Sequence, residues 1–191
     1  MKNSNKTLDE TPFQTAGPFL HIGCMPNTIK INNLYKSDLG KTPFKNKSES
    51  EFITIEGSVF DGNGNALDDV MLETWQCDEK GQFKVDKGFA RFIPDELTKK
   101  FNLKTVKPGS SKDFEGKTHS PHISLSISCR GLNMTLNTRV YFNDDYLKSD
   151  PLLSIVKTKN IKSLIAKKIE KNKYLFNIFL QGDKETVFLD I

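Results

Sequence analysis

The sequence predicts an all-β fold, an antiparallel β-sandwich, from three observations. With 191 residues, the chain is long enough for one domain with a buried core, and its fourteen Phe residues supply bulky core material. Several runs alternate apolar and polar residues with the period of two that is typical of half-buried strands. Gly, Pro and Asn residues separate these runs at short intervals, as expected for a sandwich of many short strands.

An N-terminal arm is expected ahead of the sandwich. We divide the chain into an arm and loop region, residues 1–50, and a β-sandwich domain, residues 51–191. The first ten residues are polar, but TPFQTAGPFLHIG, Thr11–Gly23, is too apolar for a solvated tail. It is also too irregular for a helix or a full strand. The arm is therefore expected to lie against another surface.

Regular structure is expected to begin at Phe52. Two β-rich runs follow, one on each side of DGNGN, residues 61–65, whose Gly and Asn residues suit the positive φ of a tight turn. The GxG within this stretch lacks a third glycine and a following helix, which favours a hairpin over a phosphate loop. Residues 80–120 are predicted to be rich in loops, because Gly and Pro punctuate them repeatedly.

The clearest strand is HISLSISCR, in which Ile123, Leu125 and Ile127 point one way and the intervening serines the other. NTRVYFND is predicted to be its partner strand. A short helix is predicted in DPLLSIV, where Asp150 precedes Pro151 at the first helical position.

The C-terminal part of the chain is predicted to be strands rather than helix. In residues 163–182 the aromatic run YLFNIFL is too apolar for an exposed helix, which favours two strands around EKNK. ETVFLDI, residues 185–191, is predicted to be the last strand.

Charge and cysteine usage narrow the class of protein. The net charge of +4 is spread along the chain without a dense basic stripe, which argues against nucleic-acid binding. No segment approaches the length needed to span a bilayer, and no apolar signal-peptide core follows the first residues. Three cysteines without a CxxC motif favour a reducing compartment, so a cytoplasmic protein is expected.

Few residues of this chain suggest chemistry from the pattern alone. His119 and His122 lie close together, but lone histidines beside a strand are more often surface or hydrogen-bonded residues than metal ligands. Arginine occurs only at positions 91, 130 and 139, in a chain that otherwise uses lysine. Its planar fork binds a carboxylate in two places, so either ligand binding or a structural ion pair is indicated. Trp75, the only tryptophan, is predicted to pack in the core.

Six segments together resemble the α-type chains of the intradiol ring-cleaving dioxygenases. They appear in the family's order: ETPFQTAGPFLHIG, GSVFDGNGNALDDVMLETWQCDEKGQF, TVKPGS, PHISLSISCRGLNMTLNTRVYFND, LIAKKIE and FNIFLQGDKETVFLDI. The combination of TPxQTAGP and HIG with TVKPG and CRGLN…TRVYF is specific. Only residues 24–50 and 84–104 align poorly.

The resemblance implies a β-sandwich of the prealbumin-like kind. It also implies a partner, because heteromeric members pair an α chain with an iron-bearing β chain, and a large assembly of such pairs is expected. In that β chain, two Tyr and two His hold a non-haem ferric iron. The implied reaction opens 3,4-dihydroxybenzoate (protocatechuate) with O₂ between its hydroxyls, giving β-carboxy-cis,cis-muconate in aromatic catabolism by the β-ketoadipate route.

The positions of the family's iron ligands decide which type of chain this is. Where catalytic chains carry two Tyr, this sequence has Phe83 and the serines at 110 and 111. Their H-x-H motif reads His122, Ile123, Ser124 here. Phenylalanine has no donor atom and a neutral serine is a poor ligand for ferric iron. The resemblance therefore implies neither an iron ligand set nor a catalytic residue in this chain.

The resemblance also implies which residues meet the substrate. In the family, the α-chain arm packs on the β chain and walls its active site, which would place Thr15, Gly17 and Pro18 at the pocket. Arg130, in CRG, matches an arginine near the substrate carboxylate. The family commonly has Tyr after AGP, whereas this chain has Phe19, so one hydroxyl near the site is lost.

Three functions are left to compare. The chain is a non-catalytic α subunit that completes a partner's site, a self-sufficient iron dioxygenase, or a prealbumin-like binding or scaffold domain without an enzyme partner. The missing ligands argue against the second function, and the apolar arm argues against the third.

Overall fold

The structure is a computed structural model that describes residues 14–45, 52–145, 150–157 and 160–190. It contains twelve strands and three short helices within these residues. Their bounds are α1 (Pro18–Cys24), β1 (Phe52–Gly57), β2 (Val59–Phe60), β3 (Val70–Trp75), β4 (Phe89–Phe92), β5 (Phe101–Val106), β6 (Ser111–Lys112), β7 (Thr118–His119), β8 (His122–Cys129), β9 (Leu136–Phe142), α2 (Pro151–Ile155), the 3-10 helix η2 (Ile161–Leu164), β10 (Ile165–Glu170), β11 (Lys173–Leu175) and β12 (Ile178–Phe179).

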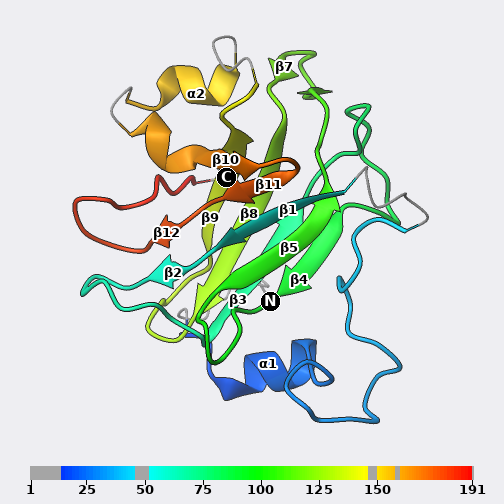
Figure 1. The fold of residues 1–191 in the computed structure, drawn as a ribbon, viewed down its shortest axis with the longest axis vertical. Coiled ribbons are helices and arrows are strands. Elements are labelled where there is room, and N and C mark those ends of the chain that lie inside the picture. Colours follow the sequence, from blue (N-terminus) through cyan, green and yellow to red (C-terminus); the bar gives the residue numbers. More distant parts are fainter. Residues whose placement is uncertain (1–13, 46–51, 146–149, 158–159, 191) are drawn as a thin grey trace, which may run out of the picture.

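Eight strands form one curled sheet in the order β4-β3-β8-β9-β10-β11-β1-β5 (Figure 1). The two edge strands come together, and the rings of Phe92 and Phe101 lie 5.8 Å apart where β4 meets β5. The fold is therefore the predicted β-sandwich, closed far enough to resemble a barrel. The sheet is mixed rather than purely antiparallel, because β1 runs parallel to β11 and β10 parallel to β9.

The core lies between the two halves of the curled sheet. Alternating residues of each strand point into it, and the fully buried apolar side chains include Val70, Leu72, Ile123, Ile127 and Phe142. This alternation is clearest in β8, where the predicted inward residues are buried and the serines between them are partly exposed. The predicted pairing of this strand with the following one, β9, is confirmed as antiparallel.

Several other sequence predictions are confirmed. The first strand begins at Phe52, the residue predicted to begin regular structure, although the helix α1 precedes it. The strands β10 and β11 form an antiparallel pair around the predicted turn. The DGNGN stretch makes a tight turn in which Gly64 has a φ of +84°, and Phe60 faces Ala66 across it. The Asp150 carboxylate caps α2 as predicted, accepting hydrogen bonds from the amides of the second and third helical residues.

Residues 80–120 are rich in loops as predicted, and they also contain β4 and the six-residue strand β5. Three local predictions are wrong. In the last segment, the described residues 185–190 form no strand beyond an isolated bridge between Leu189 and Asn137. The arm contains the helix α1, which begins at Pro18 because proline is favoured at the first helical position. Trp75 is 38% exposed and stacks on Phe83 instead of packing in the core.

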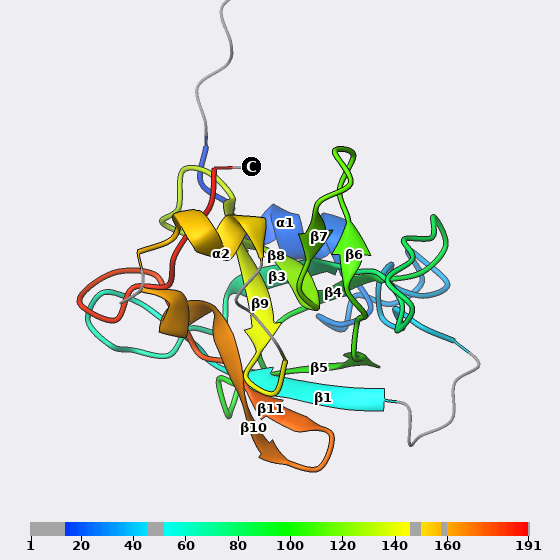
Figure 2. The ribbon, with the colours of Figure 1, turned by 90° about the horizontal axis from the view of Figure 1, so that it is seen from above.

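The molecule carries different elements at the two ends of its long axis (Figure 1), and Figure 2 looks along this axis from the α2 end. Helix α1 lies at one end of the long axis of the sheet, beside the turn after β8, and α2 lies with β7 at the other. The expected boundary at residue 50 and residues 11–13 of the arm lie outside the described residues, so the division into two regions stays a prediction. None of the helices in the described ranges is both long and apolar enough to cross a lipid bilayer.

Candidate functional site

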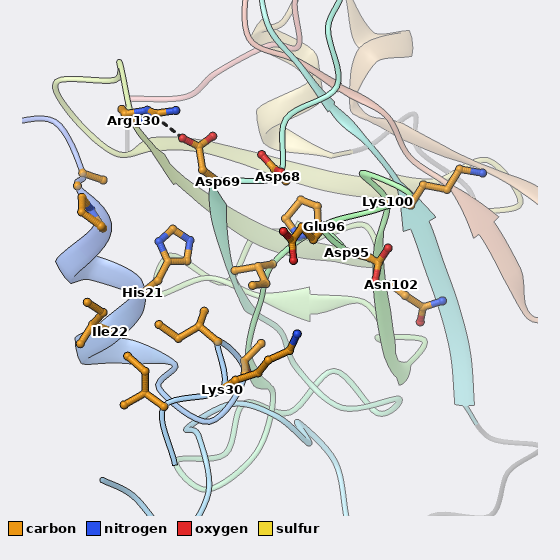
Figure 3. A pocket seen from close by; sticks show the side chains of 18 residues that line it. His21, Ile22, Lys30, Asp68, Asp69, Asp95, Glu96, Lys100, Asn102 and Arg130 are labelled. Atoms are coloured by element: carbon orange, nitrogen blue, oxygen red, sulfur yellow. Dashed lines mark ion pairs between the residues drawn. The ribbon is translucent and has the colours of Figure 1, made fainter. Parts of the chain in front are cut away.

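A cleft of about 890 Å³ opens at the α1 end of the molecule. Its walls are α1, the loop around residues 28–31, the end of the loop before β3 and the segment that joins β4 to β5 (Figure 3). Asp38 fixes the loop wall, because its buried carboxylate accepts hydrogen bonds from the backbone and side chains of Asn27 and Thr28. The cleft therefore has one wall made by the arm and another made by the sheet.

The arm is bonded to the turn that follows β8. The Thr15 hydroxyl accepts a hydrogen bond from the Gly131 amide at 2.7 Å and donates one to the Cys129 carbonyl at 3.4 Å. Two residues later the chain enters α1, with Gly17 as the residue before the helix and Pro18 as its first residue. The bond from Thr15 thus holds the beginning of α1 against the cleft.

Arg130 stands on this turn and points its guanidinium into solvent at the rim of the cleft. Its side chain is 78% exposed, and its Nε donates to the Asp69 carboxylate at 3.1 Å (Figure 3). An ion pair this exposed contributes about 0–1 kcal/mol to stability. No other hydrogen bond or ion pair of the guanidinium is found among the described residues, so its two terminal amino groups are free to bind a ligand.

His21 is a cleft residue that the sequence did not predict. It lies on α1 one turn after Pro18, and its Nε2 is buried without a hydrogen-bond partner among the described residues. Burial lowers the pKa of His21, while the nearby Asp69 carboxylate acts in the opposite direction. The spacing of Pro18 and His21 on one helix face could have indicated this placement, had the arm been recognised as helical.

The opposite end of β8 carries a buried polar network. Asp150, almost fully buried, accepts hydrogen bonds from the Ser120 amide at 2.8 Å and the Tyr141 hydroxyl at 3.1 Å, besides capping α2. The Arg139 guanidinium donates to His119 Nδ1 at 3.1 Å and to the Tyr141 hydroxyl at 3.4 Å. The other ring nitrogen of His119 meets the Asp113 carboxylate at 3.2 Å. The network ties β8 and β9 to the β6–β7 hairpin and to α2.

His122 lies beside this network, and its buried surroundings disfavour the protonated, charged form of the imidazole. Its Nδ1 is 2.8 Å from the Ser120 carbonyl, and its ring packs against Tyr141. Burial, together with the positive charge of Arg139, lowers the pKa of His122 to about 4. The imidazole is therefore neutral at physiological pH.

Comparison with known proteins identifies the family. A family model described as "Dioxygenase" matches residues 32–182. The chain is 36% identical to the protocatechuate 3,4-dioxygenase alpha chain of Pseudomonas putida, with 96% of this chain and 97% of that relative covered. It is 33% identical to the alpha chain of the same name from Burkholderia cepacia, with coverages of 97% and 99%. The chain belongs to the intradiol dioxygenase family.

A solved structure supports the same fold. The 3-chlorocatechol 1,2-dioxygenase of Rhodococcus opacus 1CP matches with a TM-score of 0.60 at 19% identity, over 73% of this chain and 64% of that one. At this level of identity the likeness shows the intradiol dioxygenase fold alone.

The positions that the resemblance aligns with the family's iron ligands lie near the buried network, and their correspondence with those ligands stays a prediction. Phe83 stacks on Trp75, with ring centroids 6.3 Å apart, and Trp75 pairs with Ser124 across β3 and β8. Ser124 in turn faces Arg139 on β9. Ser111 pairs with His119 in the β6–β7 hairpin. Within the described part of the chain, no three His, Cys, Asp or Glu side chains are grouped so that they could hold a metal ion.

The residues expected to meet the substrate gather at the other end of β8. Gly17, Pro18 and Arg130 line the cleft. Thr15 does not line it and instead bonds to the turn that carries Arg130. The substrate-binding role of all four residues stays a prediction.

Proposed function

We propose that this chain is the non-catalytic α subunit of a protocatechuate 3,4-dioxygenase, and that it completes the active site of an iron-bearing β chain. The observation that carries the proposal is the convergence of the arm and Arg130 on one cleft at the end of the sandwich. The names of two relatives that match over nearly their full length support the same role.

In this proposal the arm and the Arg130 turn face the partner's substrate. The substrate 3,4-dihydroxybenzoate is an anion at neutral pH, and Arg130 presents its two terminal amino groups to the ring carboxylate. A charge-assisted hydrogen bond of this kind is worth about 1.5–3 kcal/mol. When bound in the β chain, the iron supplies the ring-opening chemistry with O₂, and this chain binds and orients the end of the substrate that carries the carboxylate.

Gly17 supports an approach by a partner or a ligand. Its φ of −111° is accessible to any residue, and a Cβ built at this position would meet no atom within 4 Å. Neither the backbone nor the packing within the described residues therefore requires glycine here. A surface from outside this chain that comes close to the backbone would require it.

The side chains at the corresponding metal position of this chain do not fit a ferric ion. His122 is the one histidine among them, and a single imidazole does not supply a ligand set for iron. Phe83 offers no donor, and the serines at 110, 111 and 124 are poor ligands for ferric iron. The Arg139 guanidinium lies next to them and adds a positive charge that would repel a cation. We therefore propose that iron belongs to the partner alone.

The proposal extends to the setting of the enzyme. We infer a large assembly of αβ pairs that serves aromatic catabolism by the β-ketoadipate route. A cytoplasmic location suits cysteines 24, 77 and 129, which are all free thiols.

The test is to purify the chain alone, the β chain alone and the two expressed together, and to measure iron and oxygen consumption with 3,4-dihydroxybenzoate. The proposal predicts that this chain alone is colourless, holds no stoichiometric iron and tends to self-associate. Co-expression should yield a soluble, coloured, active heteromer. An iron-loaded, coloured lone chain would instead indicate a self-sufficient dioxygenase. A soluble monomer that does not bind the β chain would favour the scaffold function.

A further inference from the structure

The turn that presents Arg130 is built to hold one shape. The Leu132 amide donates to the Cys129 carbonyl at 3.2 Å, which closes a four-residue turn with Arg130 and Gly131 at its centre. Gly131 has a φ of +94°, a backbone conformation that a turn of this kind demands at its third residue and that glycine adopts at little cost. The direction of the Arg130 side chain therefore depends on this backbone.

Two side chains from distant parts of the sequence hold this turn in place. Thr15 bonds to its backbone on both sides of Arg130, at Gly131 and at Cys129. Asp69 bonds to the side chain of Arg130 through Nε. The first contact fixes the backbone of the turn. The second is an exposed ion pair at Nε, and the two terminal amino groups have no partner among the described residues.

The bonds of the Thr15 hydroxyl leave little capacity for a ligand. A threonine hydroxyl has one proton to donate and two lone pairs. Its proton is directed to the Cys129 carbonyl and one lone pair accepts the Gly131 amide. Only one lone pair remains, and the side chain is not among those that line the cleft. A direct contact between this hydroxyl and a substrate is therefore disfavoured.

We propose that Thr15 is a positioning residue, whose hydroxyl fastens the arm to the turn at residues 129–132 so that Arg130 meets the substrate carboxylate in one fixed orientation. This inference rests on the proposed function, since it assumes that Arg130 binds that carboxylate. The arm and the arginine then enter the shared active site as one unit. Disorder of the turn would weaken recognition of the carboxylate without altering the hydroxyl groups that react.

The matched variants are Thr15→Val, which keeps the branched shape and loses the hydroxyl, and Thr15→Ser, which keeps the hydroxyl. Both are studied in the heteromer with the β chain. The readout is the ratio of kcat/KM for 3,4-dihydroxybenzoate to kcat/KM for catechol, which lacks the carboxylate. Loss of one or two hydrogen bonds predicts a ratio about fivefold lower in Thr15→Val and within about twofold of wild type in Thr15→Ser.

Combination with Arg130→Ala separates positioning from direct contact. If Thr15 acts through Arg130, the Thr15→Val change lowers the ratio no further in the Arg130→Ala background. Multiplicative losses in the double variant would overturn the inference and assign Thr15 a contact of its own. An unchanged ratio in Thr15→Val alone would also overturn it. An unchanged ratio in Arg130→Ala alone would remove Arg130 from the substrate carboxylate and overturn the inference. Failure to obtain an active heteromer with the β chain would instead overturn the proposed function.

A second readout does not depend on activity. Hydrogen–deuterium exchange of the peptide that covers residues 129–135 reports on the Gly131 amide, which Thr15 protects. Exchange in this peptide should be faster in Thr15→Val and unchanged in Thr15→Ser. Equal exchange in the wild type and Thr15→Val would show that the hydroxyl does not hold the turn, and would overturn the inference.

Discussion

The charged side chains at the two ends of β8 differ in burial and in the number of their hydrogen bonds. At the Cys129 end, Arg130 is mostly exposed, and among the described residues its guanidinium bonds to one carboxylate, that of Asp69. At the His122 end, Asp150 is almost fully buried and accepts hydrogen bonds from three backbone amides and a tyrosine hydroxyl. The two ends of this eight-residue strand are seven residue steps apart, roughly 23 Å in an extended strand.

This contrast indicates that the buried end of the fold serves stability and the exposed end serves recognition. Buried hydrogen bonds within the chain stabilise the fold, because a buried donor or acceptor that loses its partner lowers the free energy of unfolding. Bonds left open at an exposed rim add little stability and are available to a ligand or a partner. Changes at the buried end should therefore affect stability, and changes at the cleft should affect recognition.

The largest expected effect is on stability, from Asp150→Ala. This change leaves three backbone amides and the Tyr141 hydroxyl without their acceptor, which should destabilise the chain by about 3–5 kcal/mol. Asp69→Ala removes a carboxylate at the cleft and should cost about 1 kcal/mol or less. Thermal unfolding of the heteromer measures both. Similar melting temperatures for the two variants would abolish the distinction between the two ends.

A second prediction concerns the pH dependence of the buried end. The pKa of His122 falls from an ordinary value near 6.5 to about 4 on folding, so between these values the unfolded chain binds more protons. The contribution of His122 to stability is complete above pH 6.5 and is lost as the pH falls toward 4. The loss between pH 7 and pH 5 should be about 2 kcal/mol.

His122→Gln provides the control for this pH effect. When the pH is lowered from 7 to 5, the melting temperature of the wild type should fall further than that of His122→Gln, because the variant has no imidazole to protonate. Parallel decreases in the two proteins would show that other groups cause the acid sensitivity.

The third prediction concerns association at the cleft end. Phe19 is 82% exposed on α1, and burial of a phenylalanine side chain is worth about 1.5–3 kcal/mol. Phe19→Ala should therefore weaken binding to the β chain about tenfold or more, whereas Phe19→Tyr keeps the ring and should bind nearly as wild type. Titration of the β chain followed by analytical ultracentrifugation measures the affinity. Undiminished affinity in Phe19→Ala would remove α1 from the interface.

Sequence reasoning worked best where one local signal dominates. The alternation in β8 and the Asp150–Pro151 cap could both be predicted from the sequence, because side-chain direction and capping depend on neighbouring residues. The helix α1 was missed, since a seven-residue helix has almost no periodic signal and depends on contacts with distant residues such as Gly131. Trp75 was misplaced because its partner, Phe83, comes from a loop on the surface.

The candidate site could be predicted only in part, because its contacts also join residues that are distant in the sequence. The family resemblance pointed to Arg130, but its pairing with Asp69 links residues 61 positions apart in the chain, and no sequence pattern records it. The buried bonds of Asp150 with Ser120 and Tyr141 are equally non-local. These contacts follow from the sheet order, in which β8 lies between β3 and β9.

The most direct test makes the same substitution at both ends. Arg130→Ala and Arg139→Ala are compared in the heteromer by melting temperature and by kcat/KM for 3,4-dihydroxybenzoate and for catechol. Arg130→Ala should lower turnover of 3,4-dihydroxybenzoate about tenfold more than that of catechol, with the melting temperature nearly unchanged. Arg139→Ala should lower the melting temperature by on the order of 5 °C and leave the substrate ratio unchanged. Equal losses on both substrates in Arg130→Ala, or a shifted ratio in Arg139→Ala, would contradict the assignment of recognition to the cleft and stability to the buried network.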